Sequence, residues 1–394
     1  MCIRDSPQFA HLLLGPLENL AVVEETVVRE KACDSINQLA GIMSDQQIQT
    51  FYLPLLHRLS SGEWFTSRTS AALLFASVYE KIPLSMRADV HSMFVSLCTD
   101  ETPMVRRAAA RDMSALVKRM SPEVIINEML PLYRRLSADD QDSVRLLTVQ
   151  NLVAMAEVLS PAETQQLLLS SICGAFQDKS WRVRYMAADN FVQLATAVGE
   201  DVVKEDLVPA YINLMRDAEA EVRTAAATQL PGLAKLLDQN TIIERLLPVA
   251  KELADDPSQH VRGALAAQVS ALAPLLGKDA TTEHLLPLFL QLLKDEFPEV
   301  RLNIISRLEQ VNEVIGIDLL SQSLLPAIMT LAEDKQWRVR QAIIENIPLL
   351  AHQLGVEFFD EQLSGLCLSW LGDTVFSIRE AATCLLYTSD AADE

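Results

Sequence analysis

The sequence predicts an all-α solenoid, a curved superhelix of stacked helix–turn–helix units that number about ten and are each about 39 residues long. Three observations predict it. One residue pattern recurs at a fixed interval along the chain. Apolar residues within each interval follow helical spacing. Leu and Ala are abundant while aromatic residues make up only 6%, which favours helices over strands. Such a unit cannot bury its apolar faces alone, but a stack of units can.

The interval is marked by a recurring arginine, and its successive lengths are 39, 38 and then seven times 39. The marker arginines are Arg29, Arg68, Arg106, Arg145, Arg184, Arg223, Arg262, Arg301, Arg340 and Arg379. From the third copy on, an Asp stands six residues earlier, at Asp100, Asp139, Asp178, Asp217, Asp256, Asp295, Asp334 and Asp373. We expect each such Asp to pair with the Arg of the adjacent turn, which would fix the stacking register. Direct contact of these residues with a partner is the alternative.

The unit from Thr281 to Gly316 shows how the elements follow from the residues. Its segment 285–293 is apolar around most of its circumference, as expected for a first helix packed between neighbours. A proline recurs fourteen residues before the marker Arg and should bend this helix, because proline removes a backbone hydrogen bond. Pro298 suits the first turn of a second, amphipathic helix over 300–315. An alanine often follows three residues after the marker Arg, where it would let second helices approach closely.

Composition limits the classes of function. The net charge of −20 disfavours a nucleic-acid partner, which needs clustered Lys and Arg, and fits plain solubility or a basic protein partner. No apolar run reaches the ~20 residues of a membrane span, so we expect no membrane partner. Six scattered cysteines without CxxC pairs indicate reduced thiols. We expect a cytoplasmic protein and leave a nuclear location open.

The two ends differ from the repeats between them. "MCIRDS" (1–6) and "CLLYTSDAADE" (384–394) back-translate, in opposite orientations, to a transposase adapter used in sequencing libraries. We therefore expect both ends to be adapter-derived and the solenoid, truncated at both ends, to occupy 7–383. Amplifying the transcript across Thr383 tests this expectation.

Motifs of catalysis are missing from the sequence. It has no HExxH, no GxSxG and no Gly-rich phosphate-binding loop, and its six histidines are isolated. Its carboxylates follow the repeat, as on a solvated face. We predict that the protein is not an enzyme and has no catalytic residue, metal, cofactor or small-molecule substrate.

Several phrases go beyond a generic repeat pattern, including "GEWFTSRTSA", "DETPMVRRAAA", "DKSWRVRYMAAD" and "HLLPLFLQLLKDEFPEVRLNIIS". With the regular helix pairs, they resemble HEAT repeats and specifically the scaffolding A subunit of protein phosphatase 2A. The resemblance covers essentially 7–383. That family has fifteen repeats, so this chain would hold about repeats three to twelve.

The resemblance implies two kinds of partner, both bound through the turns inside the repeats. Regulatory B-type subunits would contact Trp64, Phe65, Arg68, Pro103, Met104, Arg106, Arg107, Asp139, Asp142, Arg145, Ser180, Trp181 and Arg182. The phosphatase catalytic subunit would contact Gln336, Trp337, Arg338 and Phe376, the remaining part of a surface formed by more C-terminal repeats. The implied function is a non-catalytic scaffold of a serine/threonine phosphatase.

Tryptophans in turns bear on this implied function. Trp64, Trp181 and Trp337 all lie in expected turns, and exposed Trp and Arg often anchor interfaces. The structural alternative is a Trp folded over the neighbouring turn, whereas Trp370 is expected in the core. The alternative function is a HEAT-type transport or adaptor solenoid that binds a basic cargo. Such a carrier would place acidic and aromatic residues along its second helices, whereas this chain concentrates aromatic residues and Arg in the turns.

Overall fold

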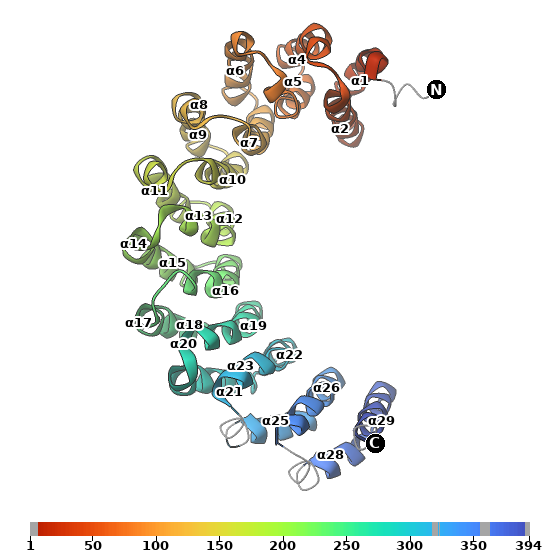
Figure 1. Cartoon of the computed structure of the whole chain (residues 1–394), viewed down its shortest axis with the longest axis vertical. Coiled ribbons are helices and arrows are strands. Elements are labelled where there is room, and N and C mark those ends of the chain that lie inside the picture. Colours follow the sequence, from red (N-terminus) through yellow and green to blue (C-terminus); the bar gives the residue numbers. More distant parts are fainter. Residues whose placement is uncertain (1–6, 317–321, 323, 355–362, 391–394) are drawn as a thin grey trace. The chain divides into compact units, whose positions relative to one another are not determined.

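The computed structural model describes residues 7–316, 322, 324–354 and 363–390, and helices account for its regular structure there. The predicted all-α solenoid is confirmed, and the helices of the described residues stack as ten pairs (Figure 1). The chain divides into two compact units, Met1–Val202 and Val203–Glu394. No helix among these residues is both long and apolar enough to span a bilayer. Residues 1–6 and 391–394 lie outside the described part, and the rest of the unusual C-terminal end belongs to the last helix.

The first unit begins with η2 (Pro7–Leu13) and contains five helix pairs. They are α1 (Leu14–Leu20) with α2 (Thr26–Ile42); α3 (Asp45–Gln47), η3 (Ile48–Tyr52) and α4 (Leu53–Ser60) with α5 (Phe65–Ala72) and η4 (Tyr79–Lys81); α6 (Leu84–Cys98) with α7 (Pro103–Val117); α8 (Pro122–Val124), η5 (Ile125–Met129) and α9 (Leu130–Ser137) with α10 (Asp142–Val158); and α11 (Pro161–Phe176) with α12 (Trp181–Asp189) and α13 (Phe191–Val198). The unit ends with α14 (Glu200–Val202).

The second unit also contains five pairs. They are η6 (Val203–Leu207) and α15 (Val208–Met215) with α16 (Ala220–Ala234); α17 (Gln239–Thr241), η7 (Ile242–Leu246) and α18 (Leu247–Leu253) with α19 (Gln259–Gln268), η8 (Val269–Leu272) and α20 (Ala273–Ala280); η9 (Thr281–Leu285) and α21 (Leu286–Leu292) with α22 (Pro298–Ile305) and α23 (Leu308–Ile315); α25 (Leu325–Ala332) with α26 (Trp337–Leu354); and α28 (Ser364–Trp370) with α29 (Phe376–Asp390).

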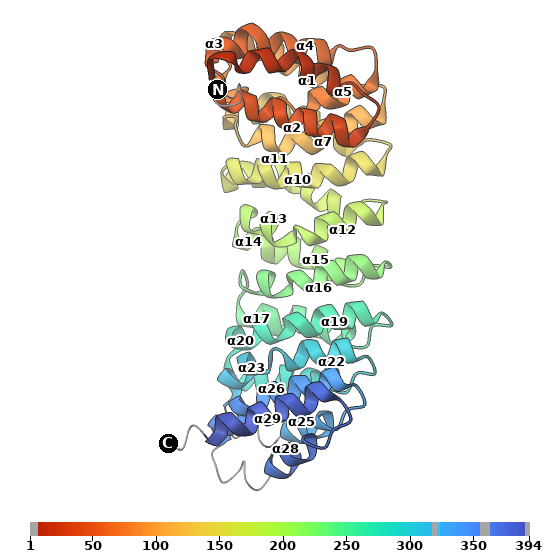
Figure 2. The same ribbon diagram turned by 90° about the vertical axis from the view of Figure 1, so that its right-hand side faces the viewer.

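Within each unit, second helices pack against second helices. In the first unit α7 contacts α5 and α10, and in the second α19 contacts α16 and α22, as the face shown in Figure 2 makes visible. The alanines three residues after the marker Arg are buried as predicted, at Ala32, Ala71, Ala109, Ala187, Ala226 and Ala382. Their small side chains allow this close stacking.

The recurrent proline of the first helix closely follows a π-helical turn. Five-residue π turns end directly before α4, α9, α15, α18 and α21, each of which carries the proline as its second residue. A wider turn removes the clash between the proline ring and the preceding carbonyl. Helices α6 and α11 have Ser92 and Ser170 at this position and continue without a π turn. The sequence predicted a bend at this proline and did not predict the π turn that the structure shows.

Second helices are less continuous than the sequence suggests. The expected helix over 300–315 is interrupted at 306–307, between α22 and α23. A similar interruption separates α12 from α13 at Asn190, whose side-chain amide donates to the carbonyl of Met186 at 2.8 Å. The same carbonyl also accepts the backbone N–H of Asn190 at 3.2 Å, so the side chain shares the acceptor with the backbone where α12 ends.

Candidate functional site

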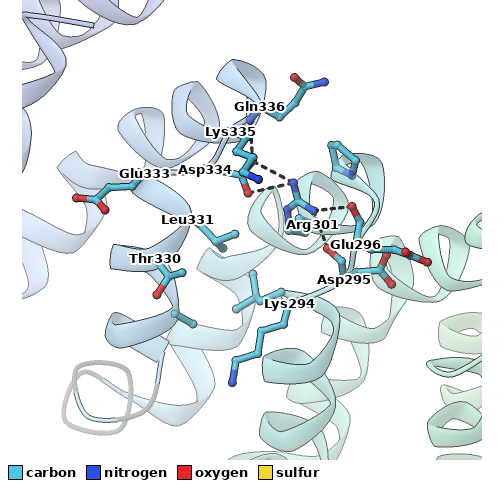
Figure 3. Close-up of a pocket in the computed structure, with 13 residues that line it drawn as sticks. Lys294, Asp295, Glu296, Arg301, Thr330, Leu331, Glu333, Asp334, Lys335 and Gln336 are labelled. Carbon is cyan, nitrogen blue, oxygen red and sulfur yellow. Dashed lines mark hydrogen bonds and ion pairs between the residues drawn. The ribbon is translucent and has the colours of Figure 1, made fainter.

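Ion pairs between neighbouring turns hold the intra-repeat turns in line. We call them the Asp–Arg ladder, and each pair a rung. In the rung shown in Figure 3, Arg301 donates through Nη1 to the carbonyls of Asp295 and Glu296 in its own turn and through Nη2 to Asp334 of the next, at 3.0 Å. Asp334 also accepts the backbone N–H of Gln336 at 2.8 Å. One rung therefore orders two consecutive turns.

The ladder recurs in both units, which confirms the predicted pairing. In the first unit the rungs are Arg68–Asp100, Arg106–Asp139 and Arg145–Asp178, with nearest distances of 2.6, 2.5 and 2.9 Å. In the second they are Arg223–Asp256, Arg262–Asp295, Arg301–Asp334 and Arg340–Asp373, at 2.6, 2.6, 3.0 and 2.9 Å. Except at Arg301, the contact is bidentate through Nε and Nη2, the geometry that suits a planar guanidinium.

Burial and charge act in opposite directions at these carboxylates. Burial alone would raise the pKa of Asp139, but hydrogen bonds from Arg106 and from the N–H of Gln141 lower that pKa below its ordinary value. The same opposition, with Arg145 and Ser180 as donors, lowers the pKa of Asp178. Both carboxylates are therefore charged at neutral pH, and these two rungs remain ion pairs.

The predicted regulatory-subunit residues fall into two groups. Four of them are ladder members and are largely enclosed, at Arg68, Arg106, Asp139 and Arg145. The turns present the others at the surface, fully or in part, at Trp64, Phe65, Pro103, Met104, Arg107, Asp142, Ser180, Trp181 and Arg182. Only this second group offers side chains that a partner could cover without breaking a rung.

The turn tryptophans lie where the second helices begin, and they remain accessible. Trp64 is 73% exposed and Trp181 is 37% exposed, while Trp337 is half-buried. The guanidinium of Arg182 lies 5.7 Å from the centre of the Trp181 ring, and that of Arg338 lies 5.1 Å from Trp337. The two phrases "DKSWRVR" and "DKQWRVR" thus build the same cation–π pair in the two units. Trp370 is buried and donates to the carbonyl of Ala332 at 3.0 Å, which confirms its expected core position.

Adjacent turns in the first unit are also joined at their surface. Ser180 donates to Asp142 Oδ2 at 2.9 Å, and Arg182 Nη1 lies 3.7 Å from the same oxygen. Three predicted contact residues from two repeats therefore form one polar cluster beside Trp181.

The predicted catalytic-subunit residues lie at the last described turns. Gln336 and Arg338 are exposed, and Phe376 is 65% exposed with the guanidinium of Arg379 5.8 Å from its ring centre. Gln336 lines a cavity of about 680 Å³ between the turns around Lys294 and Lys335 (Figure 3). Among the described residues, no group of three or more His, Cys, Asp or Glu side chains is placed to hold a metal ion.

Sequence reasoning overlooked one exception in the ladder. Arg29 is followed by a repeat turn in which Gly62, not Asp, stands six residues before the next marker Arg. Arg29 instead lines a small cavity with Arg107 and Arg111. The glycine in an otherwise acidic position was the signal that could have revealed it.

Stacked helix pairs joined by an Asp–Arg ladder define a HEAT-repeat solenoid, and comparisons with known families agree. Residues 168–198 match the HEAT repeat, 200–277 match the PPP2R1A-like HEAT repeat and 264–364 match the PIK3R4-like middle domain. Solved structures of similar fold include Kap95p bound to RanGDP (TM-score 0.70, 15% identity, 97% of this chain and 53% of that one) and importin beta (TM-score 0.66, 15% identity, 98% and 53%). At this identity they show the fold alone.

Comparison with curated proteins identifies relatives of higher sequence identity than the solved structures. The protein phosphatase PP2A regulatory A subunit of Schizosaccharomyces pombe is 55% identical over 132 residues, which are 33% of this chain and 22% of the relative. The beta isoform of the human 65 kDa regulatory A subunit is 53% identical over 112 residues (28% and 19%), and the Dictyostelium discoideum scaffold subunit is 51% identical over 126 residues (32% and 22%). The alignments span about a fifth of these relatives. Over the aligned part the chain is a homologue of the A subunits of protein phosphatase 2A.

Proposed function

We propose that this chain is a non-catalytic scaffold of a protein phosphatase 2A-type serine/threonine phosphatase. It binds a regulatory B-type subunit through the turns of its first unit and, through the turns near Trp337 and Phe376, part of the catalytic subunit. The observation that supports this most is the row of exposed aromatic and Arg side chains on turns held in line by a buried ladder, in a chain more than 50% identical to A subunits where it aligns.

The mechanism is binding rather than chemistry. Two proteins held on one scaffold meet at an effective concentration set by the geometry of the scaffold, so the catalyst acts faster on the substrate that the regulatory subunit selects. The ladder keeps consecutive turns at a fixed spacing, so anchors such as Trp64, Met104 and Trp181 are presented in one row. Rigid presentation lowers the entropy cost of docking. We place this assembly in the cytoplasm, which imaging of a tagged protein tests.

Binding of purified subunits to the full chain tests the proposal. Trp181→Ala and Arg107→Ala should each weaken regulatory-subunit binding about tenfold or more, as expected for interface anchors, while helicity by circular dichroism stays unchanged. Leu84→Ala is the control, because Leu84 is 80% exposed at the end of α6 opposite the turn. Loss of helicity in Trp181→Ala would instead identify that Trp as a packing residue.

The same measurement tests the division between the two surfaces. We expect the catalytic subunit to bind weakly or not at all, because Gln336, Trp337, Arg338 and Phe376 are only part of its implied surface. Tight catalytic-subunit binding would show that the described turns already form most of that surface. Failure of the chain to bind any regulatory B-type subunit would overturn the scaffold proposal.

A further inference from the structure

Arg29 occupies a ladder position whose usual partner is missing. In each of the three rungs of the first unit, the Arg edge formed by Nε and Nη2 holds an Asp from the next turn. The turn after Arg29 offers Gly62 at that place. Arg29 keeps the other half of the pattern, since its Nη1 donates to the carbonyls of Val23 and Glu24 at 2.8 and 2.5 Å.

The guanidinium of Arg29 is enclosed but not neutralised. Arg29 is only 8% exposed, and its remaining hydrogen bond runs from Nη2 to Thr26 Oγ1 at 3.2 Å. Within the described residues it forms no ion pair, and its Nε–H has no acceptor. An enclosed charge without a counter-charge costs more than one matched by a well-placed carboxylate. The Nε edge of Arg29 is therefore prepared for an acceptor that the described chain does not supply.

Arg29 also lines a small cavity among the second helices. It measures about 110 Å³ and lies between α2, α5 and α7, with Arg29, Arg107 and Arg111 among its lining residues. Arg107 is exposed and has no ion pair among the described residues, while Arg111 lies 3.6 Å from Glu30, the cavity's only lining carboxylate within the described chain. Arg111 also lies 3.3 Å from Asp112, so three guanidiniums stand with two carboxylates, a local excess of positive charge on a chain of net charge −20.

We propose that the Arg29 cavity takes the carboxylate of an Asp or Glu side chain from the docked regulatory B-type subunit, which completes the missing rung in trans. This inference rests on the proposed scaffold function. The choice of a carboxylate follows from the sister rungs, in which the same Arg edge holds Asp in bidentate fashion. Gly62, where the missing Asp would stand, is two residues from Trp64, which is 73% exposed. In this proposal, one partner segment contacts the indole and places its acid in the cavity.

The sequence around Gly62 shows why the chain does not fill this position and how it can be made to. A Cβ on Gly62 would lie 2.7 Å from the Cβ of Ser67 and against its Oγ, so an Asp does not fit beside Ser67. Other turns combine Asp with Val five residues later, as in Asp100 with Val105 and Asp139 with Val144. The double variant Gly62→Asp/Ser67→Val reproduces that combination and supplies the missing carboxylate from within.

The test compares regulatory-subunit binding by four full-length proteins: wild type, Gly62→Asp/Ser67→Val, Arg29→Gln and Lys31→Gln. In Gly62→Asp/Ser67→Val the chain's own Asp should pair with Arg29 and weaken regulatory-subunit binding about tenfold or more, as loss of a desolvated charge pair does. The melting temperature of this variant should stay at or above that of wild type. Arg29→Gln should weaken binding similarly. Lys31→Gln changes the same charge on an exposed part of α2 and should bind like wild type.

Each outcome decides the inference. Wild-type affinity in Gly62→Asp/Ser67→Val, with normal folding, would overturn it and leave the scaffold function standing. Loss of wild-type binding after enzymatic dephosphorylation of the regulatory subunit would assign a phosphate to the site and overturn the carboxylate. If the wild-type chain binds no regulatory subunit, the scaffold proposal fails and this inference fails with it.

Discussion

Two ion pairs join the same two repeats of the second unit and differ mainly in burial. Arg216 reaches Glu252 through Nε and Nη2 at 2.8 and 2.6 Å, and Arg223 reaches Asp256 through the same atoms at 2.6 and 3.0 Å. The side chains of Arg216 and Glu252 are 52% and 51% exposed, whereas those of Arg223 and Asp256 are 13% and 6% exposed. Both are bidentate Arg–carboxylate pairs, so the comparison chiefly tests the effect of burial.

We expect Asp256→Ala to destabilise the fold far more than Glu252→Ala. Breaking a buried pair leaves Arg223 uncompensated, which costs about 3–5 kcal/mol. It also removes the acceptor of the Ser258 N–H, whose 2.8 Å bond lies where α19 begins, for about 1 kcal/mol more. An exposed pair contributes about 0–1 kcal/mol, so the two single variants should differ by at least ~2 kcal/mol.

Urea unfolding followed by circular dichroism measures the difference, and hydrogen exchange of amides in α16 and α19 localises it, because a solenoid need not unfold in one step. At high salt the effect of Glu252→Ala should disappear while that of Asp256→Ala persists. Arg223→Met/Asp256→Leu should recover most of the loss, since neither charge remains. Equal losses in the two single variants, or full recovery of Asp256→Ala by salt, would refute the argument.

Three further predictions concern single side chains. Burial raises the pKa of Asp112 to about 6, so its folded form favours the proton, and its unfavourable contribution grows as pH rises from about 4 to about 6. Asp112→Asn should therefore add up to about 3 kcal/mol of unfolding free energy at pH 7 and little at pH 4; a gain that does not depend on pH would contradict this. Ser170→Pro places a proline in the unbroken α11 and should cost about 3 kcal/mol, measured by the urea midpoint; an unchanged midpoint would mean that a π turn forms there without cost. Trp370→Phe removes the bond to Ala332 and should cost about 1–3 kcal/mol by the same assay, and a neutral result would show that this bond adds nothing net.

The stacking register was predictable because it depends on residues that recur at one interval. Asp139 and Arg145 had to meet their neighbours once units of equal length were stacked, and the structure places them so. The exposure of Trp64 was also predictable, because the repeat places this residue in a turn, and a turn offers no interior to bury an indole. The accessibility of these side chains does not reveal which partner covers them.

Features that depend on a single repeat were harder to predict. The sequence indicates that Pro131 must bend its helix, but several backbone adjustments relieve the same clash, and only coordinates distinguish a π turn from a kink. The hydrogen bond between Ser180 and Asp142 likewise depends on residues of only two repeats. The sequence shows Gly62 where other repeats have Asp. The consequence, an Arg29 without its usual carboxylate partner, could be inferred only from the position of the Arg29 side chain in the structure.

The one irregular interval shows where this architecture accepts changes in length. The interval from Arg68 to Arg106 is one residue shorter than the others, yet Asp100 still stands six residues before Arg106 and still pairs with Arg68 at 2.6 Å. The missing residue therefore falls between Arg68 and Asp100, outside the six-residue step from Asp to Arg. Because every rung spans two repeats, deleting one whole period would join the Arg before it to the Asp after it. Copies can thus be lost or gained in evolution without leaving a buried charge unmatched, whereas a deletion that removes only the Arg or only the Asp of a rung would leave its partner unmatched.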